Sequence, residues 1–234
     1  ITDAMARGVM AVLPHIEGAE AIKPDLSNLD EYYARGLRSI GPVWSRKNAF
    51  GVGVPLGFPG HPDQGDGLSA AGLALIRAAN EKKMLIDLSH LNEKGFWDVA
   101  RVSTAPLVAT HSNSYDLCGS PRNLTAKQLA VIRESGGMVG LNFAVGFLRA
   151  DGTKKGDTPI SLMIQHLDTL IEALGEDGVA LGSDFDGAII PNAIGDAAGL
   201  GVLTQAMADA GYDDALIHKI CAGNWLHMIK KTIG

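Results

Sequence analysis

Short apolar runs alternate with longer segments of helical period along most of this chain. An apolar run of this length, bounded by glycine or polar residues, predicts a strand that is buried on both faces. Several runs are rich in the β-branched and bulky residues that strands favour. Six strands are predicted in this way: Val9 to Leu13, Leu37 to Val43, Met84 to Leu88, Leu107 to Thr110, Met138 to Phe143 and Val179 to Leu181.

The segments between these strands carry start and stop signals of helices. Thr125 and Gln128 form a T-x-x-Q capping box, which predicts a helix beginning just after Thr125. Residues Ser161 to Leu174 place their apolar side chains on one stripe, and Gly175 follows as a C-terminal cap. Further helices are predicted at Asn28 to Arg35, Ser69 to Lys82, Glu93 to Val102, Asp213 to Ala222 and from Asn224 onwards.

Buried strands that alternate with helices indicate a parallel sheet, arranged either as a doubly wound sheet or as a (β/α)8 barrel. The barrel is favoured because most predicted strands are followed by a polar, reactive side chain, as in barrel enzymes. A complete barrel takes about 250 residues and eight strands. With 234 residues, six strands and no initiator methionine, we expect one α/β domain over residues 1–234: a TIM-like barrel of the metal-dependent hydrolase type, incomplete at its N-terminus, with its first one or two βα units missing.

Composition narrows the possible partners. The chain is 46% hydrophobic, 20% charged and has a formal net charge of −6, so it lacks the basic surface that nucleic acid or anionic lipid requires. No apolar window approaches the roughly 20 residues of a membrane-spanning helix. Cys118 and Cys221 are far apart in sequence and match no metal or disulfide pattern. We therefore expect free thiols and a cytoplasmic protein without a membrane segment.

Four side chains that suit metal-dependent hydrolysis follow predicted strands. They are Glu17, His90, His111 and Asp184, after the first, third, fourth and sixth strands. Carboxylate and imidazole ligands suit zinc, and an open coordination position holds a water whose pKa the metal lowers. Each residue alone also fits an ordinary capping or solvated role, so the residues by themselves leave both interpretations open. The other histidines are assigned to loops or helix surfaces: His15, His61, His166, His218 and His227.

Several motifs in order together resemble the membrane (renal) dipeptidase family of zinc metallopeptidases. The resemblance extends over almost the whole chain, and the two histidines of the motifs are 111 − 90 = 21 residues apart. Shorter matching pieces include Ile16-Glu17-Gly18 and Gly223-Asn224. The motifs are Leu85-Ile86-Asp87-Leu88-Ser89-His90, Ala109-Thr110-His111-Ser112-Asn113-Ser114-Tyr115, Pro121-Arg122-Asn123 and Gly182-Ser183-Asp184-Phe185-Asp186-Gly187.

The resemblance implies a dipeptidase with two zinc ions in its site. Glu17 would bridge the two ions, and His90 and His111 would bind the second of them. Asp184 would act as general acid and base in hydrolysis by metal-activated water. Arg122 would bind the free carboxylate of the dipeptide through its planar fork of donors. Relatives of this kind are often homodimers.

The chain departs from the family pattern in two places. The His-x-Asp pair that supplies the first zinc ligands in the family has no counterpart here. Trp44 stands near the position where many relatives have a histidine that polarises the scissile carbonyl. The glycine- and proline-rich loop from Arg46 to Gly67 is expected to shape the pocket. Asp87 and Asp186 are candidates for orienting the histidine ligands.

The missing ligand pair keeps two other interpretations open. The chain can be a non-catalytic barrel fragment with a vestigial one-zinc site, or a barrel amidohydrolase that acts on a non-peptide amide. An incomplete barrel would also expose two unpaired strand edges, which predicts low stability for this chain alone.

Overall fold

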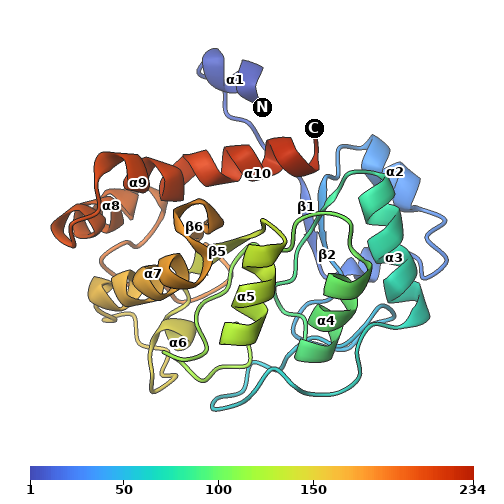
Figure 1. Cartoon of the computed structure of the whole chain (residues 1–234), viewed down its shortest axis with the longest axis horizontal. Coiled ribbons are helices and arrows are strands. Elements are labelled where there is room, and N and C mark those ends of the chain that lie inside the picture. Colours follow the sequence, from blue (N-terminus) through green and yellow to red (C-terminus); the bar gives the residue numbers. More distant parts are fainter.

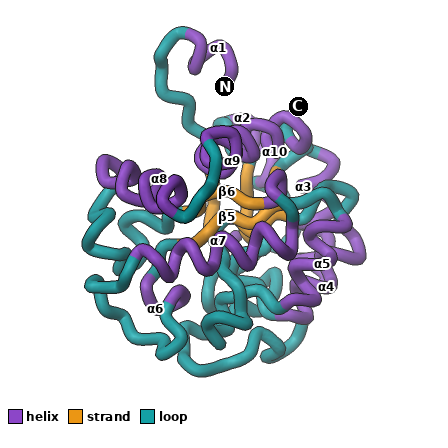
Figure 2. The backbone as a smooth tube through the Cα atoms, turned by 60° about the vertical axis from the view of Figure 1, so that its left-hand side comes forward, coloured by secondary structure: helices purple, strands orange, loops and turns teal.

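Six short parallel strands form the centre of the molecule, and helices surround them (Figures 1 and 2). The computed structural model describes the backbone of residues 1–234 and every side chain except that of Thr2. The strands are β1 (His15–Glu17), β2 (Ser39–Gly41), β3 (Leu85–Ile86), β4 (Val108–Ala109), β5 (Met138–Asn142) and β6 (Val179–Gly182).

The strands pair in sequence order. One parallel sheet has the order β1-β2-β3 and a second has the order β4-β5-β6. A parallel bridge between Asp87 and Val108 joins them, and the backbone N–H of Leu88 donates to the carbonyl of Val108 at 2.8 Å. The carboxyl ends of all six strands therefore lie at the same edge, as expected for consecutive βα units.

Helices connect the strands. The main helices are α2 (Leu29–Ala34), α3 (Ala70–Glu81), α4 (Glu93–Val102), α5 (Ala126–Glu134), α7 (Ile160–Leu174), α8 (Leu200–Asp209) and α10 (Asn224–Thr232). Shorter helices are α1 (Thr2–Ala6), α6 (Val145–Leu148) and α9 (Asp214–His218), and a π-helical turn, Lys219–Gly223, joins α9 to α10. None of the helices in the described part of the chain has the length and apolar character to cross a bilayer.

Alternate residues of the strands face two different cores. Ile86, Ala109 and Val139 belong to the large core shared with the surrounding helices. Their neighbours point to the other face of the sheet, where a small second core is covered by Met228 and Trp225 of α10. The strand residues of this small second core are Leu85, Val108, Met138 and Ala180.

Two residues further along the strands, the face that carries the small second core changes to polar residues and glycines. Asp87 and Thr110 lie two residues after Leu85 and Val108, and Gly140 and Gly182 lie two residues after Met138 and Ala180. A Cβ atom at Gly140 or Gly182 would come within 2.0 Å or 1.9 Å of the Thr110 carbonyl oxygen, so only glycine fits at either position. This packing fixes the chain just before His111.

Most predicted elements are confirmed, with shorter strands than expected. The capping box at Thr125 forms in full, and Glu93–Val102 is a helix as predicted. The first strand is wrong: residues 9 to 13 are not in a strand, and Met10 is 87% exposed. Strand pairing begins only after Pro14, where His15 and Glu17 pair with β2.

Candidate metal centre

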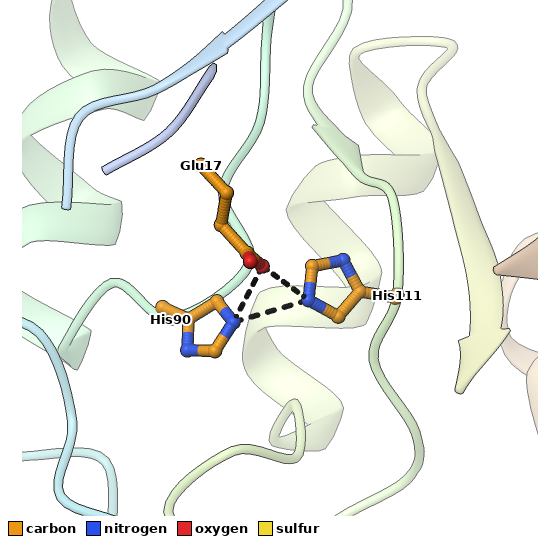
Figure 3. Close-up of side chains that lie close together, drawn as sticks. All are labelled: Glu17, His90 and His111. Carbon is orange, nitrogen blue, oxygen red and sulfur yellow. Dashed lines mark hydrogen bonds and ion pairs between the residues drawn. The ribbon is translucent and has the colours of Figure 1, made fainter. Parts of the chain in front are cut away.

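Glu17, His90 and His111 converge at the carboxyl ends of three strands (Figure 3). Glu17 is the last residue of β1, while His90 and His111 follow β3 and β4. Glu17 Oε1 lies 2.9 Å from the Nε2 atom of each histidine, and the two Nε2 atoms are 3.1 Å apart. Residues separated by up to 94 positions are thus brought to one point, as the parallel topology predicts.

These distances suit a bound cation. Zinc ligands at about 2.0–2.1 Å in tetrahedral geometry lie about 3.3 Å from one another, close to the spacing found here. Burial, followed by the charge of Arg122, lowers the pKa of His90 to about 3, so the ring is neutral at pH 7. Hydrogen bonds from His111 and then His90 hold the pKa of Glu17 well below its usual range. The set therefore offers a carboxylate and a neutral imidazole, which are the ligating forms.

The ring of His111 is held from behind by Thr110 and Asp87. The Thr110 hydroxyl donates to Asp87 Oδ2 at 2.6 Å and lies 2.7 Å from His111 Nδ1. Burial opposes ionisation of Asp87, but the nearby His111 and His15 rings and the hydrogen bonds from Thr110 outweigh it, and the pKa of Asp87 is lowered. An ionised Asp87 only accepts, so the single hydroxyl proton goes to Asp87 and His111 Nδ1–H donates to Thr110. His111 Nε2 is the ring nitrogen that faces Glu17 and His90.

His90 is oriented by its backbone and by a serine. Its φ angle of 71° lies in the left-handed region, which is strained for a residue with a Cβ atom. Its carbonyl accepts from the Val54 N–H at 2.8 Å, and its Nδ1 lies 2.7 Å from Ser45 Oγ. Trp44 packs beside the ring, with 5.9 Å between the ring centroids. Both imidazoles are therefore fixed by a hydroxyl on the nitrogen that faces away from Glu17.

A pocket of about 410 Å³ opens beside this cluster. Glu17, His90 and Asp184 line it together. Asp184, which follows β6, has a φ angle of 57°, and its Oδ2 accepts from Asn142 Nδ2 at 3.2 Å. Leu56, from the loop expected to shape the pocket, also lines it.

The remaining lining residues are Trp44, Ala144, Val145, Gly146, Phe147, Lys154, Asp186, Gly187, Ala188 and Ile189. Trp44 and Asp186 were singled out in the sequence, and Lys154 was not.

Arg122 lies behind the cluster and is not among the residues that line the pocket. Its side chain is buried, and its Nη2 donates to the His111 carbonyl at 3.1 Å. Its Nε is buried without a hydrogen-bond partner among the described residues. Burial lowers the pKa of Arg122, and the charges of Asp184, Asp87 and Glu17 oppose that shift. The guanidinium thus keeps donor capacity beside His111.

Two of the other histidines differ from their predicted places. His166 is on α7 but buried, not on its surface: its Nδ1 accepts from the Ser114 N–H and its Nε2 donates to the Leu148 carbonyl. His15 lies in β1, where its Nδ1 is 2.9 Å from Ser39 Oγ. Neither belongs to the metal-ligand cluster.

A family model described as membrane dipeptidase (peptidase family M19) matches residues 1–233. This chain belongs to the membrane dipeptidase family. An M19 metallopeptidase of this kind is an enzyme, and the metal implied by the family agrees with the ligand cluster.

Relatives and solved structures support the assignment. An uncharacterized protein in the pqqA 5' region of Klebsiella pneumoniae is 52% identical over 96% of this chain and 83% of its own length. A metallopeptidase from Rhodobacter sphaeroides, solved with a phosphinate mimic of the dipeptide L-Ala-D-Ala, is 54% identical with a TM-score of 0.97 over 99% of this chain. Dipeptidase AC, a metallopeptidase of family M19, is 53% identical with a TM-score of 0.98 over 100% of this chain.

The membrane dipeptidase relatives are longer than this chain. It spans 66% of the Rhodobacter structure, 69% of dipeptidase AC and 55% of an Acinetobacter calcoaceticus relative that is 49% identical over 74% of this chain.

Proposed function

We propose that the intact protein is a zinc-dependent dipeptidase and that these six strands belong to a (β/α)8 barrel whose first one or two βα units are absent from this chain. The observation that carries the proposal is the triangle of Glu17, His90 and His111, in which three ligand atoms lie 2.9–3.1 Å apart. The L-Ala-D-Ala mimic in the Rhodobacter enzyme supports a dipeptide as substrate.

Glu17, His90 and His111 would hold the metal in this proposal, with Glu17 shared between two zinc ions. Bound zinc would supply a Lewis acid that polarises the scissile carbonyl and lowers the pKa of water. The protein contributes the orientation of the ligands, because Thr110 and Ser45 fix the two imidazole rings. Ligands held in this way need no rearrangement when the ion binds.

Asp184 would move protons during the reaction. It lines the same pocket as Glu17 and His90, and Asn142 holds one carboxylate oxygen at 3.2 Å. The second oxygen, Oδ1, accepts no hydrogen bond from the described residues, so it is free to take a proton from the attacking water and return it to the leaving amine.

Arg122 would bind the free carboxylate of the dipeptide. Only one of its guanidinium nitrogens, Nη2, donates to a described protein group. A buried guanidinium with unused donors is a strong receptor for a carboxylate, because the alternative is an unsatisfied buried cation. This requirement for a nearby free carboxylate would explain a preference for dipeptides over longer peptides.

The test is dipeptide hydrolysis by the full-length protein before and after chelation, with bound metal measured in parallel. We expect hydrolysis that is lost with the metal and restored by zinc. Activity that survives complete metal removal refutes the proposal. A panel of dipeptides, N-acyl amino acids and lactams separates a dipeptidase from an amidohydrolase, and failure to cleave any of them favours a vestigial binding site.

A further inference from the structure

The pocket beside the metal ligands contains one cation that the proposed reaction does not use. Lys154 is the only lysine or arginine that lines it among the described residues, whereas Glu17, Asp184 and Asp186 supply carboxylates. Lys154 forms no ion pair or side-chain hydrogen bond with the described part of the chain, although several surface lysines do, Lys82 and Lys219 among them. An ammonium at a pocket wall without a protein partner is available to a ligand.

Lys154 extends from a turn whose shape is fixed. Arg149 binds both carboxylate oxygens of Asp151 at 2.9 Å, and the N–H and hydroxyl of Thr153 donate to Asp151 at 3.0 Å and 2.8 Å. Gly152, with a φ angle of 63°, lies against the ring of Phe58, where any Cβ atom would clash. Asp151 is therefore occupied by Arg149 and Thr153 and does not neutralise Lys154.

The stem of Lys154 lies over Gly146. A Cβ atom added at Gly146 would be 3.3 Å from Lys154 Cγ and 3.8 Å from its Cε, so the stem runs along the backbone of α6. The next residue, Phe147, also lines the pocket, and its ring centroid is 5.4 Å from the guanidinium carbon of Arg122. Lys154 and Arg122 thus lie against two consecutive residues, Gly146 and Phe147, and of the two cations only Lys154 lines the pocket.

We propose that Lys154 forms a subsite for a carboxylate on the side chain of the substrate's C-terminal residue. The inference rests on the proposed dipeptidase function, in which Arg122 binds the α-carboxylate of that same residue. A second carboxylate on that residue then pairs with Lys154, whose stem packs on Gly146 next to Phe147. The favoured substrates are dipeptides that end in aspartate or glutamate.

The experiment compares kcat/KM of the zinc-loaded, full-length protein for Ala-Asp, Ala-Asn and Ala-Ala, with both L and D forms of the second residue. Ala-Asn is the neutral counterpart of Ala-Asp and controls for size. We expect Lys154→Met, which keeps most of the stem, to lose about 5-fold in kcat/KM for Ala-Asp, mainly through KM, and to be unchanged for Ala-Asn, because the lost contact is a partly exposed ion pair. Lys154→Glu should then favour Ala-Lys over Ala-Asp.

Lys155→Met is the matched control, since both lysines are exposed and only Lys154 lines the pocket. It should leave all ratios unchanged. An equal loss for the three substrates in Lys154→Met would place Lys154 at the α-carboxylate and overturn the proposal, as would an unchanged ratio of Ala-Asp to Ala-Asn. If the wild-type protein cleaves none of the dipeptides, the dipeptidase function fails as well, whereas cleavage with unaltered ratios rejects the subsite alone.

Discussion

Thr110→Val removes a single hydroxyl from behind His111, one of the proposed metal ligands, and keeps the shape of the side chain. The hydroxyl donates to Asp87 Oδ2 at 2.6 Å and accepts from His111 Nδ1 at 2.7 Å. Without it, Asp87 keeps two backbone donors on Oδ1, from Ser89 and Thr110, and Oδ2 is left with only two distant ring nitrogens, His15 Nε2 at 3.7 Å and His111 Nδ1 at 3.9 Å. The His111 ring then loses the partner that fixes its tautomer and its rotation.

The cost has two parts. Loss of an outer hydrogen bond to a metal-binding histidine typically weakens metal binding by about 10- to 100-fold, which corresponds to about 1.4–2.8 kcal/mol. A hydrogen bond to a buried carboxylate contributes about 1.5–3 kcal/mol to folding. Zinc affinity and the free energy of unfolding should therefore both fall in Thr110→Val.

Zinc affinity is measured by competition with a chromogenic chelator, and stability by denaturant unfolding of the metal-free protein. Thr110→Ser, which retains the hydroxyl, should recover most of the zinc affinity, and Thr104→Val at an exposed position should change neither quantity. If Thr110→Val binds zinc as tightly as wild type, the relay from Asp87 through Thr110 to His111 does not orient the ligand.

Two further predictions concern proton transfer and pH. Asp184→Asn should lower kcat by at least about 100-fold while the zinc content stays near that of wild type, because general acid–base catalysis contributes about 10²- to 10⁴-fold; an unchanged kcat would reject the role given to Asp184. Burial lowers the pKa of His166 to about 4, against a bond to the Leu148 carbonyl that raises it. The unfolded chain therefore takes up the proton first, and as the pH falls from about 6.5 to 4 the free energy of unfolding should drop by about 3 kcal/mol. His166→Gln, which does not titrate, should flatten this part of the profile measured by denaturant unfolding, and an equally steep profile would contradict the assignment.

Much of the fold could be predicted because β2 to β5 are buried on both faces and α3, α4 and α5 begin with capping side chains. The strand predicted at residues 9 to 13 does not form, because an apolar sequence becomes a strand only where a neighbouring strand pairs with it. Met10 and Val12 have 87% and 73% of their surfaces exposed. The helix α8 was missed because Leu200–Asp209 has no capping side chain and begins at a glycine.

The convergence of Glu17, His90 and His111 could be predicted because parallel strands bring their carboxyl ends to one edge. The residues that hold the two imidazole rings from behind could not be predicted in this way. Ser45 Oγ contacts His90 Nδ1 while residue 90 has a left-handed backbone conformation. The neighbouring residues in the sequence do not predict that conformation. The position of Lys154 in the pocket could not be predicted for another reason. It depends on the turn that the contact between Arg149 and Asp151 holds in place.

The bonds that hold His90 and His111 come from hydroxyl groups and backbone, and none of them requires an ion. In small zinc domains the fold itself appears only when the metal arrives. Here Glu17 lies at the end of β1, and the hydroxyls of Ser45 and Thr110 hold the two imidazoles that converge on it. Because this support comes from protein groups, we expect metal to be removed and restored without unfolding of the surrounding chain.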